Sequence, residues 1–101
     1  MSITTHIHDS VASISLSGAV DYSTQEEFRT ANAKALSGAN VREIQVDLGD
    51  VTFLDSSAIR GLLILQKQAE EKGISLILLN CGRSIRDIFE VGGFDKMFMI
   101  R

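Results

Sequence analysis

The sequence contains no proline and only one cysteine, Cys81. A single cysteine excludes an internal disulfide and a metal site built from several cysteines. We expect Cys81 to be a small buried residue at the end of a strand and not a reactive thiol. Because proline is absent, glycine, asparagine and aspartate must mark the turns of the chain.

An excess of positive charge is also missing. Ten Lys and Arg residues against thirteen Asp and Glu residues give a net charge of −3, whereas nucleic-acid binding requires a basic surface. The apolar runs are far shorter than the roughly 20 residues of a membrane-spanning helix, and the N-terminus lacks the basic start and apolar core of a signal peptide. We therefore expect no nucleic-acid partner, no insertion into a membrane and a cytoplasmic location.

The hydrophobic residues follow the pattern of a single α/β (α+β) domain over residues 1–101. A length of 101 residues with a hydrophobic fraction of 45% allows one core and no second domain. The order β-β-α-β-α-β-α-β predicts a mixed central sheet of about five strands with three or more helices packed against it. The predicted strands are 4–8, 11–17, 43–48, 74–79 and 97–100, and the predicted helices are 23–36, 55–72 and 84–92, with a loop over 49–54.

Glycines and short polar residues set the predicted boundaries of these elements. Gly18 is predicted to end the second strand. Ser23 and Glu26 have the spacing of a capping box at the start of the first helix. The same spacing recurs at Ser84 and Asp87, which indicates a capped third helix.

Histidines are too few to indicate an active site. His6 and His8 lie two residues apart on one face of the first predicted strand, and without further ligands nearby they are a weak metal signal. We expect both side chains to face solvent. The glycine patterns of dinucleotide and P-loop sites do not occur. We therefore predict no metal, no cofactor and no enzymatic activity.

The segment 51–63 has more polar residues at a helix start than a cap needs. Asp55, Ser56 and Ser57 stand together after two large apolar residues, although one short polar side chain is enough to cap a helix. Redundant capping is one interpretation. The other is a serine at an exposed helix N-terminus, where backbone N–H groups and the helix dipole favour an added phosphate.

This segment resembles the STAS domain family and, within it, the anti-sigma factor antagonists of bacterial partner-switching systems. Three stretches that span nearly the whole chain carry the resemblance: 18–21; 53–58 with 61–63; and 78–80 with 85–89 and 93–94. The first matches the family pattern Gly-x-hydrophobic-Asp, and the second contains the Asp-Ser-Ser motif, which is the most specific of the three.

The resemblance implies that Ser57, the second serine of the motif, is a phosphate acceptor. The unmodified protein would bind an anti-sigma factor that is also its serine kinase, phosphorylation would abolish binding, and a serine phosphatase would restore it. By the same resemblance, Asp21, Asp55, Ser56 and Ala58 form the surroundings of the acceptor and the surface that binds the partner.

Arg60 departs from the family pattern, because many members have a small residue at this position. It lies three residues after Ser57 on the same helix face, where its guanidinium could pair with a phosphate or contact a partner. An ordinary solvated arginine is the alternative. A phosphate at Ser57 would add about −1.5 to −2 charges beside Asp21 and Asp55, so we expect a local electrostatic switch without refolding.

Two other functions stay open. STAS domains also occur as accessory subunits of membrane transport ATPases, including lipid-transport systems, and those subunits usually need no kinase. An acyl hydrolase that uses Ser57 is the third function, although no base is placed to activate the hydroxyl.

Overall fold

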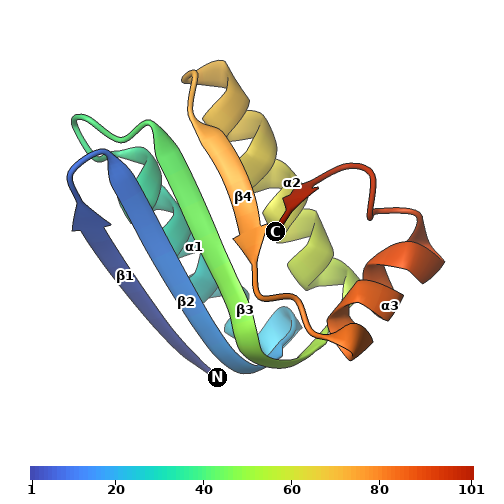
Figure 1. Ribbon diagram of the computed structural model, residues 1–101. Coiled ribbons are helices and arrows are strands. Elements are labelled where there is room, and N and C mark those ends of the chain that lie inside the picture. The colour runs from blue at the N-terminus through green and yellow to red at the C-terminus, as the bar shows by residue number, and fades with distance from the viewer.

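Five strands form one mixed sheet, as predicted from the sequence (Figure 1). They are β1 (Ser2–His8), β2 (Val11–Val20), β3 (Glu43–Leu54), β4 (Ser75–Leu79) and β5 (Met99–Ile100). The computed structural model describes residues 1–101. The strands lie side by side in chain order, β1 pairs antiparallel with β2, and all other neighbours pair in parallel.

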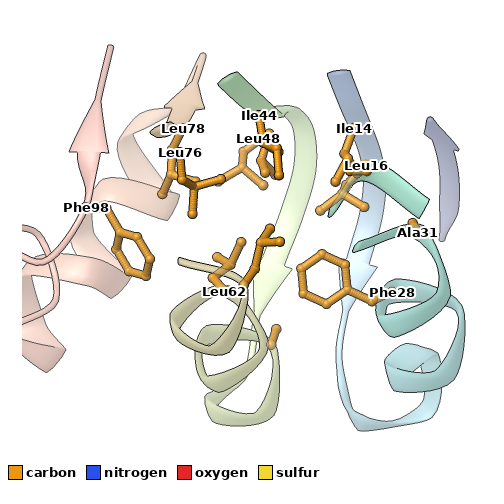
Figure 2. Close-up of a cluster of buried hydrophobic side chains, with 14 of the residues drawn as sticks. Ile14, Leu16, Phe28, Ala31, Ile44, Leu48, Leu62, Leu76, Leu78 and Phe98 are labelled. Atoms are coloured by element: carbon orange, nitrogen blue, oxygen red, sulfur yellow. The ribbon is translucent and has the colours of Figure 1, made fainter. Parts of the chain in front are cut away.

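Three helices pack on one face of this sheet (Figures 1 and 2). They are α1 (Gln25–Leu36), which follows the short 3-10 helix η1 (Tyr22–Thr24), α2 (Ser56–Glu71) and α3 (Arg83–Gly92). Figure 2 shows Ile14 and Ile44 of the sheet facing Phe28 and Leu62 of the helices across one apolar layer. None of the three helices has the length and apolarity that crossing a membrane requires.

Polar and apolar residues alternate along most of β2 and the first half of β3. Alternate residues of β2 and β3 are buried, namely Ala12, Ile14, Leu16, Ile44, Val46 and Leu48. In β4, three consecutive residues, Leu76 to Leu78, are buried, and of these Leu76 and Leu78 belong to the core under the helices. Strands and helices therefore contribute similar numbers of side chains to the core between them.

The predicted ends of β2 and β3 are wrong, and β1 and β5 each start two residues away from the predicted position. Gly18 does not end β2, and residues 49–54 do not form a loop but continue β3. Gly18 has a φ of +78° and lies beside a shift in the register between β2 and β3. Such shifts are β-bulges, which bend a strand without ending its pairing. Glycine and aspartate, which suggested a turn at 49–54, here belong to an irregular strand.

The predicted capping box at the first helix is also wrong. The cap is Asp21 and not Ser23: the carboxylate of Asp21 accepts the backbone N–H of Ser23 at 3.0 Å. The backbone N–H of Asp21 in turn donates to Oγ1 of Thr24 at 3.1 Å. This reciprocal pair lies two residues earlier in the chain than predicted, because the helix opens with the extra turn η1.

The start of α3 differs from the prediction as well. Its N-cap is Gly82, and no side chain accepts a hydrogen bond from the first turn, so Ser84 and Asp87 do not form a capping box. Asp87 instead lies 3.4 Å from Arg83 in an exposed ion pair. The predicted end is confirmed, because Gly93 ends the helix with a φ of +75°.

The helices α1 and α2 begin at the same end of the sheet. Each follows a strand, and those strands, β2 and β3, are parallel neighbours. The turn from β2 to α1 therefore lies beside the turn from β3 to α2. Residues 33 positions apart in the chain, Tyr22 and Asp55, meet here through a hydrogen bond.

Candidate functional site

The candidate site forms where β3 passes into α2. Leu54 is buried at the end of β3, and Asp55 follows in an extended conformation as the N-cap of α2. Its carboxylate oxygen Oδ1 accepts the backbone N–H of Ala58 at 2.9 Å and the hydroxyl of Ser57 at 2.7 Å. Of the three capping candidates in the sequence, Asp55 is the one that caps the helix.

The neighbouring turn, from β2 to α1, completes the site. The backbone N–H of Tyr22 donates to Oδ2 of Asp55 at 3.0 Å, and the backbone N–H of Asp55 donates to the carbonyl of Val20 at 3.3 Å. Asp21, which caps η1, lies between Val20 and Tyr22 in the chain, and both of these residues bond to Asp55. The structure thus brings Asp21 and Asp55 into adjoining turns around Ser57.

Asp55 is a strongly bonded carboxylate. Burial alone would raise its pKa, but hydrogen bonds from the Ser57 hydroxyl and from backbone N–H groups, including those of Ala58 and Tyr22, lower the pKa below its ordinary value. A carboxylate with a lowered pKa is a weak general base. Its geometry suits it to hold the Ser57 hydroxyl in position rather than to deprotonate it.

The other predicted site residues divide into exposed and buried ones. Ser56 and Arg60 are exposed, and Arg60 forms no ion pair within the chain. Ser57 is partly buried and donates its hydroxyl to Asp55. Ala58 has its side chain buried in the core, so it offers the site only its backbone N–H.

A groove between α1 and α2 opens from this site. Its volume is about 910 Å³, and it is lined by residues of both helices and of the two turns at their N-termini. Gly61 lies on its floor against Phe28, where an added Cβ would come within 2.9 Å of the ring. At the opposite end, Nζ of Lys72 donates to the carbonyl of Leu36 at 3.2 Å, which joins the C-terminal ends of the helices.

Two residues of this region are absent from the sequence prediction. Tyr22, the only tyrosine of the chain, has 74% of its surface exposed beside Asp55. Asn32 lines the groove, is 7% exposed, and its Oδ1 has no hydrogen-bond partner. A signal for Asn32 exists in the sequence, because it lies four residues from Phe28 and from Leu36, on the apolar stripe of the helix.

The remaining candidates lie outside the site. His6 and His8 are exposed on β1, as predicted, with their ring centroids 6.4 Å apart. No group of three or more potential metal ligands occurs in the chain. Cys81 is a buried free thiol just after β4, as predicted, and burial raises its pKa.

Known proteins with similar sequences carry the same kind of domain. A family model described as "Mlab, STAS domain" matches residues 3–101. The STAS-domain containing protein PA14_20770 of Pseudomonas aeruginosa is 32% identical over 87 residues, which cover 86% of this chain and 84% of that protein. BtrV of Bordetella bronchiseptica, a proposed anti-sigma factor antagonist, is 27% identical over 85 residues, or 84% of this chain and 72% of that protein.

Solved structures share the fold. The anti-sigma factor antagonist SpoIIAA in its unphosphorylated form superposes with a TM-score of 0.76 at 22% identity, covering 99% of this chain and 87% of that chain. A sulfate transporter family protein from Wolinella succinogenes superposes with a TM-score of 0.77 at 13% identity, covering 91% of this chain and 74% of that chain. None of these proteins is named as an enzyme. Since the family model matches nearly the whole sequence, the chain belongs to the STAS domain family.

Proposed function

We propose that this protein is an anti-sigma factor antagonist of a bacterial partner-switching system. In its unphosphorylated form it binds an anti-sigma factor that is also a serine kinase, and phosphorylation of Ser57 abolishes the binding until a serine phosphatase removes the phosphate. The observation that carries the proposal is the placement of the Ser57 hydroxyl, held by Asp55 at the start of α2 beside the turn that contains Asp21. The likeness to BtrV supports the same function.

The switch acts through charge. A phosphate on Ser57 would add about −1.5 to −2 charges to a surface that already holds the carboxylates of Asp21 and Asp55. Repulsion of an acidic partner surface and the desolvation of the phosphate would then weaken binding. The N-terminal end of α2 stabilises the phosphate within the domain, so the backbone keeps its conformation.

Retention of partners from the native extract tests the proposal. Wild type, Ser57→Ala and Ser57→Asp would be used as baits, with Ser84→Asp as a matched control, and the retained proteins would be identified by mass spectrometry. We expect a kinase-like ATP-binding protein with wild type, Ser57→Ala and Ser84→Asp, but not with Ser57→Asp. Equal retention of that protein by Ser57→Asp would contradict the switch.

A phosphorylated sample tests whether the change is local. Amide chemical-shift differences between the unmodified and phosphorylated protein should be confined to the two turns and the first turn of α2. Differences spread across all five strands would indicate refolding and contradict the electrostatic mechanism.

The second candidate function is an accessory subunit of a membrane transport ATPase. The same fold in a sulfate transporter family protein supports it. The bait experiment separates the two candidates: a transport ATPase subunit retained equally by wild type, Ser57→Ala and Ser57→Asp would favour the accessory subunit and leave Ser57 as part of a helix cap.

A further inference from the structure

The α1–α2 groove, defined above by its position between the two helices, has features that neither the cap nor the proposed phosphate explains. Its wall residues recur at three- and four-residue spacing along both helices, so it follows the helix axes away from Ser57. A volume of about 910 Å³ lies within the range of roughly 300–1,000 Å³ of sites that hold one organic molecule.

The two sides of the groove each contribute one arginine at the same level. Arg29 and Arg60 both stand four residues after the first residue of their helix, and both line the groove. Arg60 has no ion pair, and Arg29 has only an exposed one with Glu26 at 3.5 Å, which contributes little. Asp21 is the one carboxylate among the lining residues, so the groove favours an anion although the chain as a whole is acidic.

Asn32 supplies the second observation. It lies about one helical turn beyond Arg29, its residue surface is 93% buried, and Oδ1 has no partner. A buried acceptor without a donor destabilises the folded protein. A molecule that carries an N–H or O–H group next to its anionic group would provide the missing donor.

Apolar surface continues the groove past Asn32. Ala33 and Leu36 of α1 line it, and Ile64 of α2, with 48% of its surface exposed, stands at its edge. The order along the groove is thus a pair of cations, an unpaired amide and an apolar surface. Organic-ligand sites typically combine apolar walls with such a small number of placed polar groups.

We propose that the α1–α2 groove binds an anionic amphiphile with an amide or hydroxyl group beside its carboxylate, in the manner of an N-acyl amino acid. The carboxylate lies between Arg29 and Arg60, the polar group bonds to the side-chain amide of Asn32, and the acyl chain covers Ile64 and Leu36. This binding needs neither a protein partner nor phosphorylation of Ser57. It can therefore be tested separately from the proposed function.

Calorimetric titration with N-decanoylglycine tests this binding on the unphosphorylated chain, and amide chemical shifts locate it. We expect saturable binding at one site with shifts along α1 and α2. Arg29→Gln combined with Arg60→Gln should lower the affinity at least about tenfold, whereas Arg83→Gln, an exposed arginine of α3, should leave it unchanged. Decyltrimethylammonium, which has an apolar chain but the opposite charge, should not bind the groove.

The role of Asn32 is tested by comparing two ligands of matched length. Tridecanoate replaces the amide of N-decanoylglycine by methylene groups, and wild type should bind it several-fold more weakly. Asn32→Leu should remove this preference without lowering the midpoint of thermal unfolding, because it removes an unpaired buried oxygen. A preference that persists in Asn32→Leu would overturn the role of the amide.

Other results would overturn the proposal as a whole. These are the absence of saturable binding, equal binding of decyltrimethylammonium, and wild-type affinity in the double arginine variant. Shifts of the groove residues that appear only with a protein captured in the bait experiment would assign the groove to a partner protein and overturn it too.

Discussion

The helices α2 and α3 begin with a similar sequence but in different surroundings. Each has a serine at its second position, Ser57 in α2 and Ser84 in α3. Ser57 is partly buried and donates its hydroxyl to Asp55, whereas Ser84 is exposed and α3 starts from Gly82 without a side-chain cap. The position of a serine in a helix therefore does not define a site. The acidic cap and the neighbouring turn do.

The largest expected effect concerns the partner. Ser57→Asp should weaken binding of the captured anti-sigma factor by about 2–3 kcal/mol, or roughly a hundredfold, because a fixed negative charge is added beside two carboxylates. Ser84→Asp adds the same charge to the uncapped helix and should change the affinity less than about twofold. Surface plasmon resonance with the purified partner measures both. A loss of similar size in Ser84→Asp would show that net charge matters and the site does not.

Loss of the cap should have the next largest effect. Asp55→Ala removes the acceptor of three hydrogen bonds, from Ser57, Ala58 and Tyr22, and should lower the free energy of unfolding by about 1–2 kcal/mol. Asp87→Ala removes an exposed ion pair of α3 and should lower it by less than about 0.5 kcal/mol. Urea denaturation of both variants and of wild type measures these changes in the free energy of unfolding. Equal losses would mean that the cap of α2 has no special role.

The lowered pKa of Asp55 predicts a dependence of stability on pH. Because its pKa in the folded protein lies below the ordinary value of 3.8, its ionised form stabilises the fold above that value, and this contribution is lost as pH falls through the folded pKa. Between neutral pH and about pH 2, wild type should therefore lose more stability than Asp55→Asn. Thermal unfolding over this pH range measures it, and parallel curves for the two proteins would contradict the prediction.

The smallest effect should come from giving α3 the cap that α2 has. Gly82 has a φ of −72°, and an added Cβ would meet no atom within 4 Å. Gly82→Asp should therefore be accommodated and should raise the free energy of unfolding by a few tenths of a kcal/mol. Differential scanning calorimetry detects the matching rise in the unfolding midpoint. A lower midpoint would show that the backbone at Gly82 does not tolerate a side chain.

Most of the fold could be predicted from the sequence, because burial on one side of a sheet imposes a visible alternation. The inward residues of β2 and β3, the start of α2 at Asp55 and its end at Gly73, with a φ of +71°, follow from local patterns. The bulges could not be predicted in the same way. A register shift belongs to a pair of strands, so the residues of one strand alone do not reveal that Gly18 and 49–54 stay in the sheet.

Only the part of the site that consecutive residues form could be predicted from the sequence. The run Asp55 to Ser57 marks a helix start by itself, and the resemblance to the STAS family named Asp21 as its neighbour. The bond from Tyr22 to Asp55 and the groove beside Asn32 depend on two turns and two helices that lie far apart in the chain. Local periodicity carries no information on which elements become neighbours. The polar Asn32 on an apolar stripe was the one visible indication.

The helices α1 and α2 are tied to each other at both ends, by the Tyr22–Asp55 bond at their N-termini and by the Lys72–Leu36 bond at their C-termini. Hydrogen bonds at both ends limit how far the two helices can separate or slide past each other. The groove between them is therefore preformed, and a ligand would bind it without moving the helices. Removing either bond would let the helices separate at that end.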